Sequence, residues 1–167
     1  HQLNGVMKML EDLLVYLEIQ ANRVRFTYST ADIADELGSV LGVYKDLASR
    51  KSVRINVTAE SFLLKTDIIH FHQVIGNILS NAIKFTPSNG FIDISINQNS
   101  EYLELAIKDS GVGIPSELLE VVTDPFKGGR IGLEGEKSFS IGLHISKKIM
   151  ELMGGGLSIT SVVSKGT

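Results

Sequence analysis

The spacing of hydrophobic positions changes along the chain, and its first pattern is helical. Leu3, Val6, Leu10, Leu13 and Leu17 recur three and four residues apart, which is the seam of an amphipathic or coiled-coil helix. Such a seam can face the core of its own domain, or it can belong to a helix that dimerises with another copy. The spacing fits both roles equally.

Between residues 24 and 110, short alternating runs and helical periods follow one another. Alternation predicts strands, and apolar residues three to four apart predict helices. Ser29 or Thr30 is expected to cap the first of these helices and Asp67 the second, which ends before Pro87. The expected strands cover 24–28, 53–57, 62–65, 92–96 and 103–107, the last two as a hairpin, and the first helix covers 33–47.

The last third of the chain begins without periodicity. Residues 115–138 hold a short helix near 117–122 and then a glycine-rich, charged tract, which we expect to be a mobile loop. A helix is expected from Ser140 onward, and Gly154 can cap it. Residues 157–163 then alternate, which predicts a last strand.

The order of these elements predicts an α+β fold. Helices and hairpin strands are mixed, and each has one apolar face, so we expect two layers. In this arrangement a mixed, mostly antiparallel sheet is covered on one face by helices. The order lacks repeated β-α-β units, which argues against a doubly wound nucleotide fold.

Composition removes several function classes. The chain has 167 residues, of which 43% are hydrophobic, and its net charge is −3. This balance argues against a nucleic-acid-binding surface, and the absence of cysteine excludes disulfides and thiolate metal sites. No apolar run has the length of a membrane span. The helical pattern is already under way at His1 and no closing signal precedes Thr167, so we expect a piece of a longer protein.

A polar stripe on the helix that follows Asp67 is the first candidate for chemistry. In NILSNAIKF, the residues Asn77, Asn81 and Lys84 stand four and three apart and share one face. A solvated face is the ordinary explanation of such a stripe, but solvated helices favour Glu, Lys and Arg over Asn. Two amide oxygens beside a lysine suit a magnesium ion that is bridged to phosphates.

The second candidate is the segment DSGVGI, from Asp109 to Ile114, at the end of the hairpin. Glycines let a backbone turn tightly and approach a ligand closely. A carboxylate at a strand end can accept a hydrogen bond from an exocyclic amine. The same letters also fit an ordinary turn. Pro115 and the spacing do not match a dinucleotide-binding fingerprint.

Taken in order, the motifs are far more specific than any one of them. NILSNAIKFTP, DSGVGIP, DPF, a glycine-rich gap, SIGLHIS, GG and SKGT resemble the ATP-binding catalytic domain of sensor histidine kinases. These kinases share the Bergerat-type fold with gyrase, MutL and a major heat-shock chaperone. The resemblance implies that residues 24–167 form this catalytic domain, with an ATP lid at about 115–140, and that residues 1–23 are the end of a dimerisation helix.

The resemblance implies a role for each matching position. On the phosphate side, Asn81 should ligate Mg²⁺, Asn77 should support it, and Lys84 should reach a phosphate, so Asn77 and Lys84 are the catalytic candidates. On the adenine side, Asp109 should bind the amino group and Thr167 should close the pocket. The other expected nucleotide-binding residues are Gly111, Gly113, Ile114, Phe126, Lys127, Arg130, Ser140, Gly142 and Leu143.

The sequence departs from the family in its second glycine motif. Where the family has G-x-G-L-G-L, this chain has Ser138, Phe139, Ser140, Ile141, Gly142 and Leu143. A serine restricts φ and adds a side chain where glycine amides would point at phosphates. Either ATP binds in an altered way, or the domain is a catalytically degenerate regulatory module. We favour retained binding, because the asparagines, the lysine and the aspartate of the other motifs are all present.

The resemblance also implies the partners. The domain should transfer the γ-phosphoryl group of Mg-ATP to a histidine on its own dimerisation domain, and a response regulator or receiver domain should be a further partner. The parent should be a homodimer whose catalytic domain is cytoplasmic, without direct membrane contact. No phosphoacceptor segment is recognisable, and we expect His70, His72 and His144 to be structural.

Overall fold

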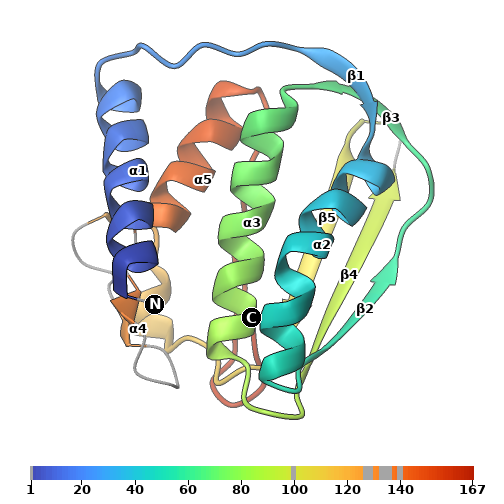
Figure 1. Ribbon diagram of the computed structural model, residues 1–167, viewed down its shortest axis with the longest axis vertical. Coiled ribbons are helices and arrows are strands. Elements are labelled where there is room, and N and C mark those ends of the chain that lie inside the picture. Colours follow the sequence, from blue (N-terminus) through green and yellow to red (C-terminus); the bar gives the residue numbers. More distant parts are fainter. Residues whose placement is uncertain (1, 99–100, 126–129, 132–136, 139–140) are drawn as a thin grey trace.

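The computed structural model describes residues 2–98, 101–125, 130–131, 137–138 and 141–167. Its long helices stand side by side, and the central strands lie behind the helices at the right of the view (Figure 1). The helices are α1 (Gln2–Gln20), α2 (Ile33–Arg50), α3 (Ile68–Phe85), α4 (Ser116–Leu119) and α5 (Ile141–Leu152). The strands are β1 (Ser29–Asp32), β2 (Arg54–Thr58), β3 (Leu63–Thr66), β4 (Phe91–Gln98), β5 (Leu103–Asp109), β6 (Arg130–Ile131) and β7 (Lys137–Ser138).

The central sheet has the order β2-β4-β5. β2 runs parallel to β4, and β4 runs antiparallel to β5 in the hairpin that the alternating pattern predicted. β1 and β3 form a separate antiparallel pair. Helices α2 and α3 cover one face of the central sheet, and α5 packs beside α3 (Figure 1). The expected α+β, two-layer fold with a mixed sheet is therefore confirmed.

The core lies between these two layers. Its largest fully buried side chains come in pairs from α2, α3, β4 and α5, and each such residue stabilises the fold by about 1.5–3 kcal/mol relative to an exposed position. The pairs are Ile33 and Leu37, Leu79 and Ile83, Ile92 and Ile94, and Ile145 and Ile149. Because α3 is the central helix of the layer (Figure 1), it is fixed on both sides.

Two expectations near β1 are wrong. Residues 24–28 form no strand, because Thr27 donates its N–H to the Asp67 carboxylate at 2.5 Å and the Phe26 ring packs on His70 with centroids 4.7 Å apart. The alternation there records packing of side chains rather than pairing of backbones. The cap of α2 is Asp32, which accepts from the N–H of Ala34 at 2.9 Å, whereas Ser29 and Thr30 belong to β1.

The expected last strand at 157–163 is also wrong. In the described part of the chain, this segment has only an isolated bridge between Val162 and Gly166. Ser164 has a φ of 62°, so the backbone folds back and Val162 pairs within its own turn. The apolar residues that alternate here, among them Leu157 and Ile159, line a cavity instead.

Helix α1 turns much of its seam outward. Ile19 is buried and Tyr16 packs against the core, but Met7, Leu10, Leu13, Leu14 and Leu17 are all at least 40% exposed. Helix α1 therefore packs against the core through Tyr16 and Ile19, whereas Leu10, Leu13 and Leu17 of the seam face outward. None of the helices in the described residues is both long and apolar enough to cross a bilayer.

Candidate functional site

A cavity of about 1380 Å³ lies beside α3 and β5. It is also lined by the loop after β5, by α5 and by the C-terminal segment from Gly154 to Thr167. Cavities that bind small molecules are usually of several hundred cubic ångströms, so this one is large enough for a nucleotide. Six of the expected site residues line it: Asn81, Asp109, Gly113, Ile114, Leu143 and Thr167.

Asn77 lies one turn before Asn81 on α3 and is only 6% exposed. Its Nδ2 donates to the carbonyl oxygen of Gly142 at 3.3 Å and to Oγ of Ser146 at 3.4 Å. Both partners belong to α5, where Ser146 also donates to Gly142. Asn77 thus joins α3 to the first turns of α5, which is a supporting position for Asn81 rather than an open ligand.

Asn81 is half-buried and presents the polar stripe of α3 to the cavity. Lys84 is half-buried as well, and its Nζ lies 5.8 Å from the ring centroid of Phe85. A lysine stem is long and flexible, so its ammonium group can leave an aromatic face for a stronger anionic partner. Asn81 therefore places an amide in the cavity wall, and Lys84 places a cation three residues further along α3.

Asp109 also lines the cavity. It closes β5, is 8% exposed, and accepts at Oδ1 from the N–H of Gly111 at 2.8 Å and of Thr167 at 3.3 Å. Burial raises the pKa of Asp109, while these two backbone hydrogen bonds act in the opposite direction and only partly offset it. The result is a shielded carboxyl group held in one orientation.

The glycines of DSGVGI are needed because other backbone lies very close. A Cβ on Gly111 would lie 2.5 Å from Oδ1 of Asp109 and 2.6 Å from the carbonyl oxygen of Phe85. Gly113 has a φ of +71°, and a Cβ there would lie 2.2 Å from the carbonyl oxygen of Val162. The loop therefore lies directly against the end of α3 and against the C-terminal segment.

Ser161 is a site residue that sequence reasoning did not find. Its Oγ accepts from the N–H of Ile114, donates to the carbonyl oxygen of Gly166 and lies next to Oγ1 of Thr167, each at 2.8 Å. It thereby links the loop after β5 to the Ser-Lys-Gly-Thr end of the chain. The only signal for it was a polar residue in an otherwise apolar alternation just before that motif.

Some of the expected lid residues lie outside the described part of the chain. Phe126, Lys127 and Ser140 are among them, whereas the backbone of Arg130 begins β6, which pairs with β7. Gly142 and Leu143 form the first turn of α5: Gly142 accepts from Asn77, and Leu143 lines the cavity.

The described residues contain no cluster of three or more His, Cys, Asp or Glu side chains that could hold a metal ion. A metal ion bound near Asn81 would be held by the amide oxygen of that side chain and by phosphate oxygens of a bound nucleotide. That combination is unsuited to zinc, but it matches magnesium, which is often held by one or two protein groups and substrate phosphates.

Comparison with known sequences gives the same assignment as these residues. Residues 66–167 match the family described as histidine kinase-, DNA gyrase B- and HSP90-like ATPase. Among curated relatives, the sensor histidine kinase RcsC of Escherichia coli (strain K12) is 28% identical over 97% of this chain, which spans 17% of that protein. The histidine-protein kinase ArlS of Staphylococcus aureus (strain USA300) is 27% identical over 99% of the chain, which spans 37% of it.

Comparison with solved structures shows the same fold. The Acinetobacter baumannii histidine kinase AdeS superposes with a TM-score of 0.82 at 22% identity, covering 99% of this chain and 76% of that one. The histidine kinase ThkA, in complex with the response regulator TrrA, superposes with a TM-score of 0.73 at 23% identity, covering 98% of this chain and 47% of that one. The resemblance drawn from the motif order is confirmed, and the chain belongs to the family of histidine kinase-, DNA gyrase B- and HSP90-like ATPases.

Proposed function

We propose that this chain is the ATP-binding catalytic domain of a sensor histidine kinase, which transfers the γ-phosphoryl group of Mg-ATP to a histidine outside the chain. The observation that carries the proposal is one cavity lined by two chemically different kinds of side chain. Asp109 and Thr167 are suited to an adenine amino group, Asn81 is suited to phosphates and their metal ion, and all three line the cavity.

The side chains have distinct tasks in this proposal. Asn81 would hold Mg²⁺ together with phosphate oxygens, and Asn77 would fix α3 against α5 beneath it. Mg²⁺ held there would supply charge neutralisation to the phosphates. Lys84 contributes a further positive charge. In the transfer, the bond between Pγ and the β–γ bridging oxygen breaks, a bond from Pγ to a histidine nitrogen forms, and ADP leaves, so the protein mainly orients the reactants and offsets charge.

The division of the chain and its partners are part of the proposal. Residues 1–23 would be the end of a dimerisation helix, which the outward-facing leucines of α1 support. The parent would be a homodimer with this domain in the cytoplasm. A response regulator or receiver domain would accept the phosphoryl group, as suggested by the ThkA structure, which contains a response regulator.

Calorimetric titration with ATP, with and without Mg²⁺, tests the binding step. Wild-type protein is expected to bind ATP more tightly with Mg²⁺, and Asn81→Ala should remove that enhancement. Asn97→Ala is the matched control, because Asn97 is an exposed asparagine at the end of β4. Equal ATP affinity with and without Mg²⁺ in the wild type would contradict the role given to Asn81.

A regulatory module without catalysis is the second candidate, and it rests on one observation. Ser138 and Ser140 stand where the family has glycines. Incubation of the chain with ATP and a dimerisation domain from a relative separates the two candidates. Phosphohistidine on that domain supports the kinase, whereas tight ATP binding without any phosphohistidine supports the regulatory module.

A further inference from the structure

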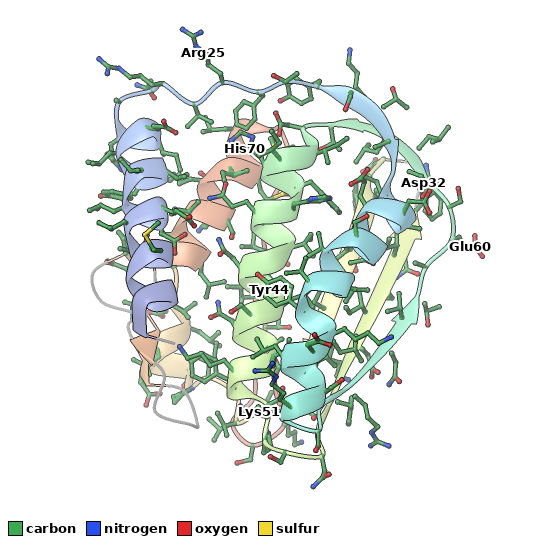
Figure 2. The ribbon with its side chains drawn as sticks, viewed as in Figure 1. Arg25, Asp32, Tyr44, Lys51, Glu60 and His70 are labelled. Atoms are coloured by element: carbon green, nitrogen blue, oxygen red, sulfur yellow. The ribbon has the colours of Figure 1, made fainter. Side chains whose placement is uncertain are left out.

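Lys51 is a buried lysine that no motif identified. It follows α2 as its C-terminal cap and is 8% exposed. Its Nζ donates to the carbonyl oxygen of Lys84 at 2.7 Å and to that of Ile83 at 3.1 Å. Figure 2 shows Lys51 at the end of α2, beside the last turn of α3. Burying an ammonium group is costly, so this position calls for a reason.

The last turn of α3 supplies the first part of that reason. The final four carbonyls of a helix have no partner within it. Here Ala82 accepts from the N–H of Thr86 at 3.1 Å and from its Oγ1 at 2.6 Å, and Phe85 accepts from the N–H of Val112 at 3.2 Å. Lys51 binds the two carbonyls in between, so it completes the set and places a positive charge at the negative end of the helix.

This turn lies between the two halves of the proposed site. Its residue Lys84 carries the cation of the phosphate side. Its last carbonyl, on Phe85, holds Val112 in the glycine loop that starts at Asp109. The Lys51 ammonium group therefore holds the backbone of Lys84 itself, next to the hydrogen bond that connects the phosphate side to the adenine side.

We infer that Lys51 is a positioning residue for nucleotide binding: by clamping the Ile83 and Lys84 carbonyls, it aims the Lys84 side chain at the phosphates. The inference rests on the proposed function, because it needs a phosphate-bearing ligand. If Lys51 only stabilised the fold, its replacement would lower stability without selecting between phosphate and adenine contacts. The two roles therefore differ in which ligand is affected and in whether the effect depends on Lys84.

A double-mutant cycle on the full 167-residue chain tests the inference. The variants are Lys51→Met, Lys84→Met and the double variant, each titrated with Mg-ATP and with adenosine at a temperature where all are folded. Lys45→Met is the matched control, because Lys45 is an exposed lysine on the same helix. A charge-assisted contact that is lost should raise the Kd of Mg-ATP on the order of tenfold.

The expected result is selective and non-additive. Lys51→Met should raise the Kd of Mg-ATP, leave the Kd of adenosine unchanged, and add little once Lys84 is already Met. The inference would be overturned if the two single substitutions raised the Kd of Mg-ATP by factors that simply multiply in the double variant. It would also be overturned if Lys51→Met raised the Kd of adenosine as much as that of Mg-ATP. Either result would leave the proposed function intact. Absence of Mg-ATP binding in the wild type would instead overturn the proposed function and this inference with it.

A second variant covers a failure of Lys51→Met to fold. Lys51→Arg keeps the charge, but a larger, planar guanidinium group replaces the single ammonium group that donates to both carbonyls. Its smaller rise in the Kd of Mg-ATP should likewise disappear in the Lys84→Met background. A rise that persists there would overturn the inference.

Discussion

Asp109 and Thr167 hold each other through two hydrogen bonds. The N–H of Asp109 donates to the carbonyl oxygen of Thr167 at 2.9 Å, and the N–H of Thr167 donates to Oδ1 of Asp109 at 3.3 Å. A carboxylate that is fixed in this way needs no reordering when it accepts a hydrogen bond from a ligand. The end of the chain therefore preorganises the residue proposed to read the adenine amino group.

Asp109→Asn is expected to weaken ATP binding about 10- to 100-fold, because a hydrogen bond to a charged acceptor is worth about 1.5–3 kcal/mol. Asparagine has the same shape as aspartate, so the loss of affinity does not require a change in the structure. Calorimetric titration with Mg-ATP measures it. Asp46→Asn, an exposed aspartate on α2, is the control and should bind as the wild type does. Equal affinity in both variants would argue against adenine recognition by Asp109.

The same aspartate should leave a pH signature in stability. Because burial raises its pKa above the model-peptide value of 3.8, the folded state binds more protons than the unfolded state between the two pKa values. The free energy of unfolding contributed by Asp109 therefore falls as pH rises through that window. Urea unfolding of wild type and Asp109→Asn from pH 3 to pH 7 should show the variant gaining relative stability as pH rises. A constant difference would contradict the raised pKa.

Asp67 should show the opposite pH dependence. Burial works to raise its pKa, but hydrogen bonds from the N–H groups of His70 and Thr27 and from the His70 ring outweigh that effect, so the pKa is lowered. Its contribution to stability is thus present above the ordinary value of 3.8 and is lost as pH falls through the folded pKa. As the cap of α3, Asp67→Ala should cost about 1 kcal/mol at pH 7. In urea unfolding, that cost should shrink toward pH 2, and a cost that grows would refute the assignment.

Asp67 also shows what sequence could predict. Local residue types predicted that Asp67 caps α3 and that β4 pairs with β5. The structure confirms both expectations. The alternating runs at 24–28 and 157–163 predicted strands wrongly, because alternation reports which side chains face the interior and not whether a partner backbone is present.

Some residues of the site could likewise be predicted from the sequence, and others could not. The motif order identified six of the residues that line the cavity, including Asn81 and Asp109. Ser161 and Lys51 were missed because their partners, Ile114 and the Ile83 carbonyl, are far away in sequence. No local pattern encodes such a contact, since the fold alone brings the two segments together.

Gly113→Ala should destabilise the fold by about 2–4 kcal/mol, because the new Cβ would meet the carbonyl oxygen of Val162 at 2.2 Å and φ is +71°. Gly154→Ala separates the two causes. Gly154 has a φ of +84° but open space around it, so that variant should lose only about 1 kcal/mol. Urea unfolding of both variants measures the difference. Equal losses would mean that the backbone at Val162 moves aside freely.

The exposed seam of α1 gives the last prediction. Leu10 and Leu14 are one turn apart, 52% and 62% exposed, and serve no core. Replacing both with Glu should change the free energy of unfolding by only about 0.5 kcal/mol, whereas Ile19→Ala, at a buried position on the same helix, should cost about 2–4 kcal/mol. If the seam is a dimerisation surface, sedimentation velocity at high protein concentration should show self-association in the wild type and a monomer in the Leu10→Glu, Leu14→Glu variant. Identical sedimentation of the two proteins would remove the support that α1 gives to a dimeric parent. A large decrease in the free energy of unfolding of the double variant would instead show that Leu10 and Leu14 belong to the core.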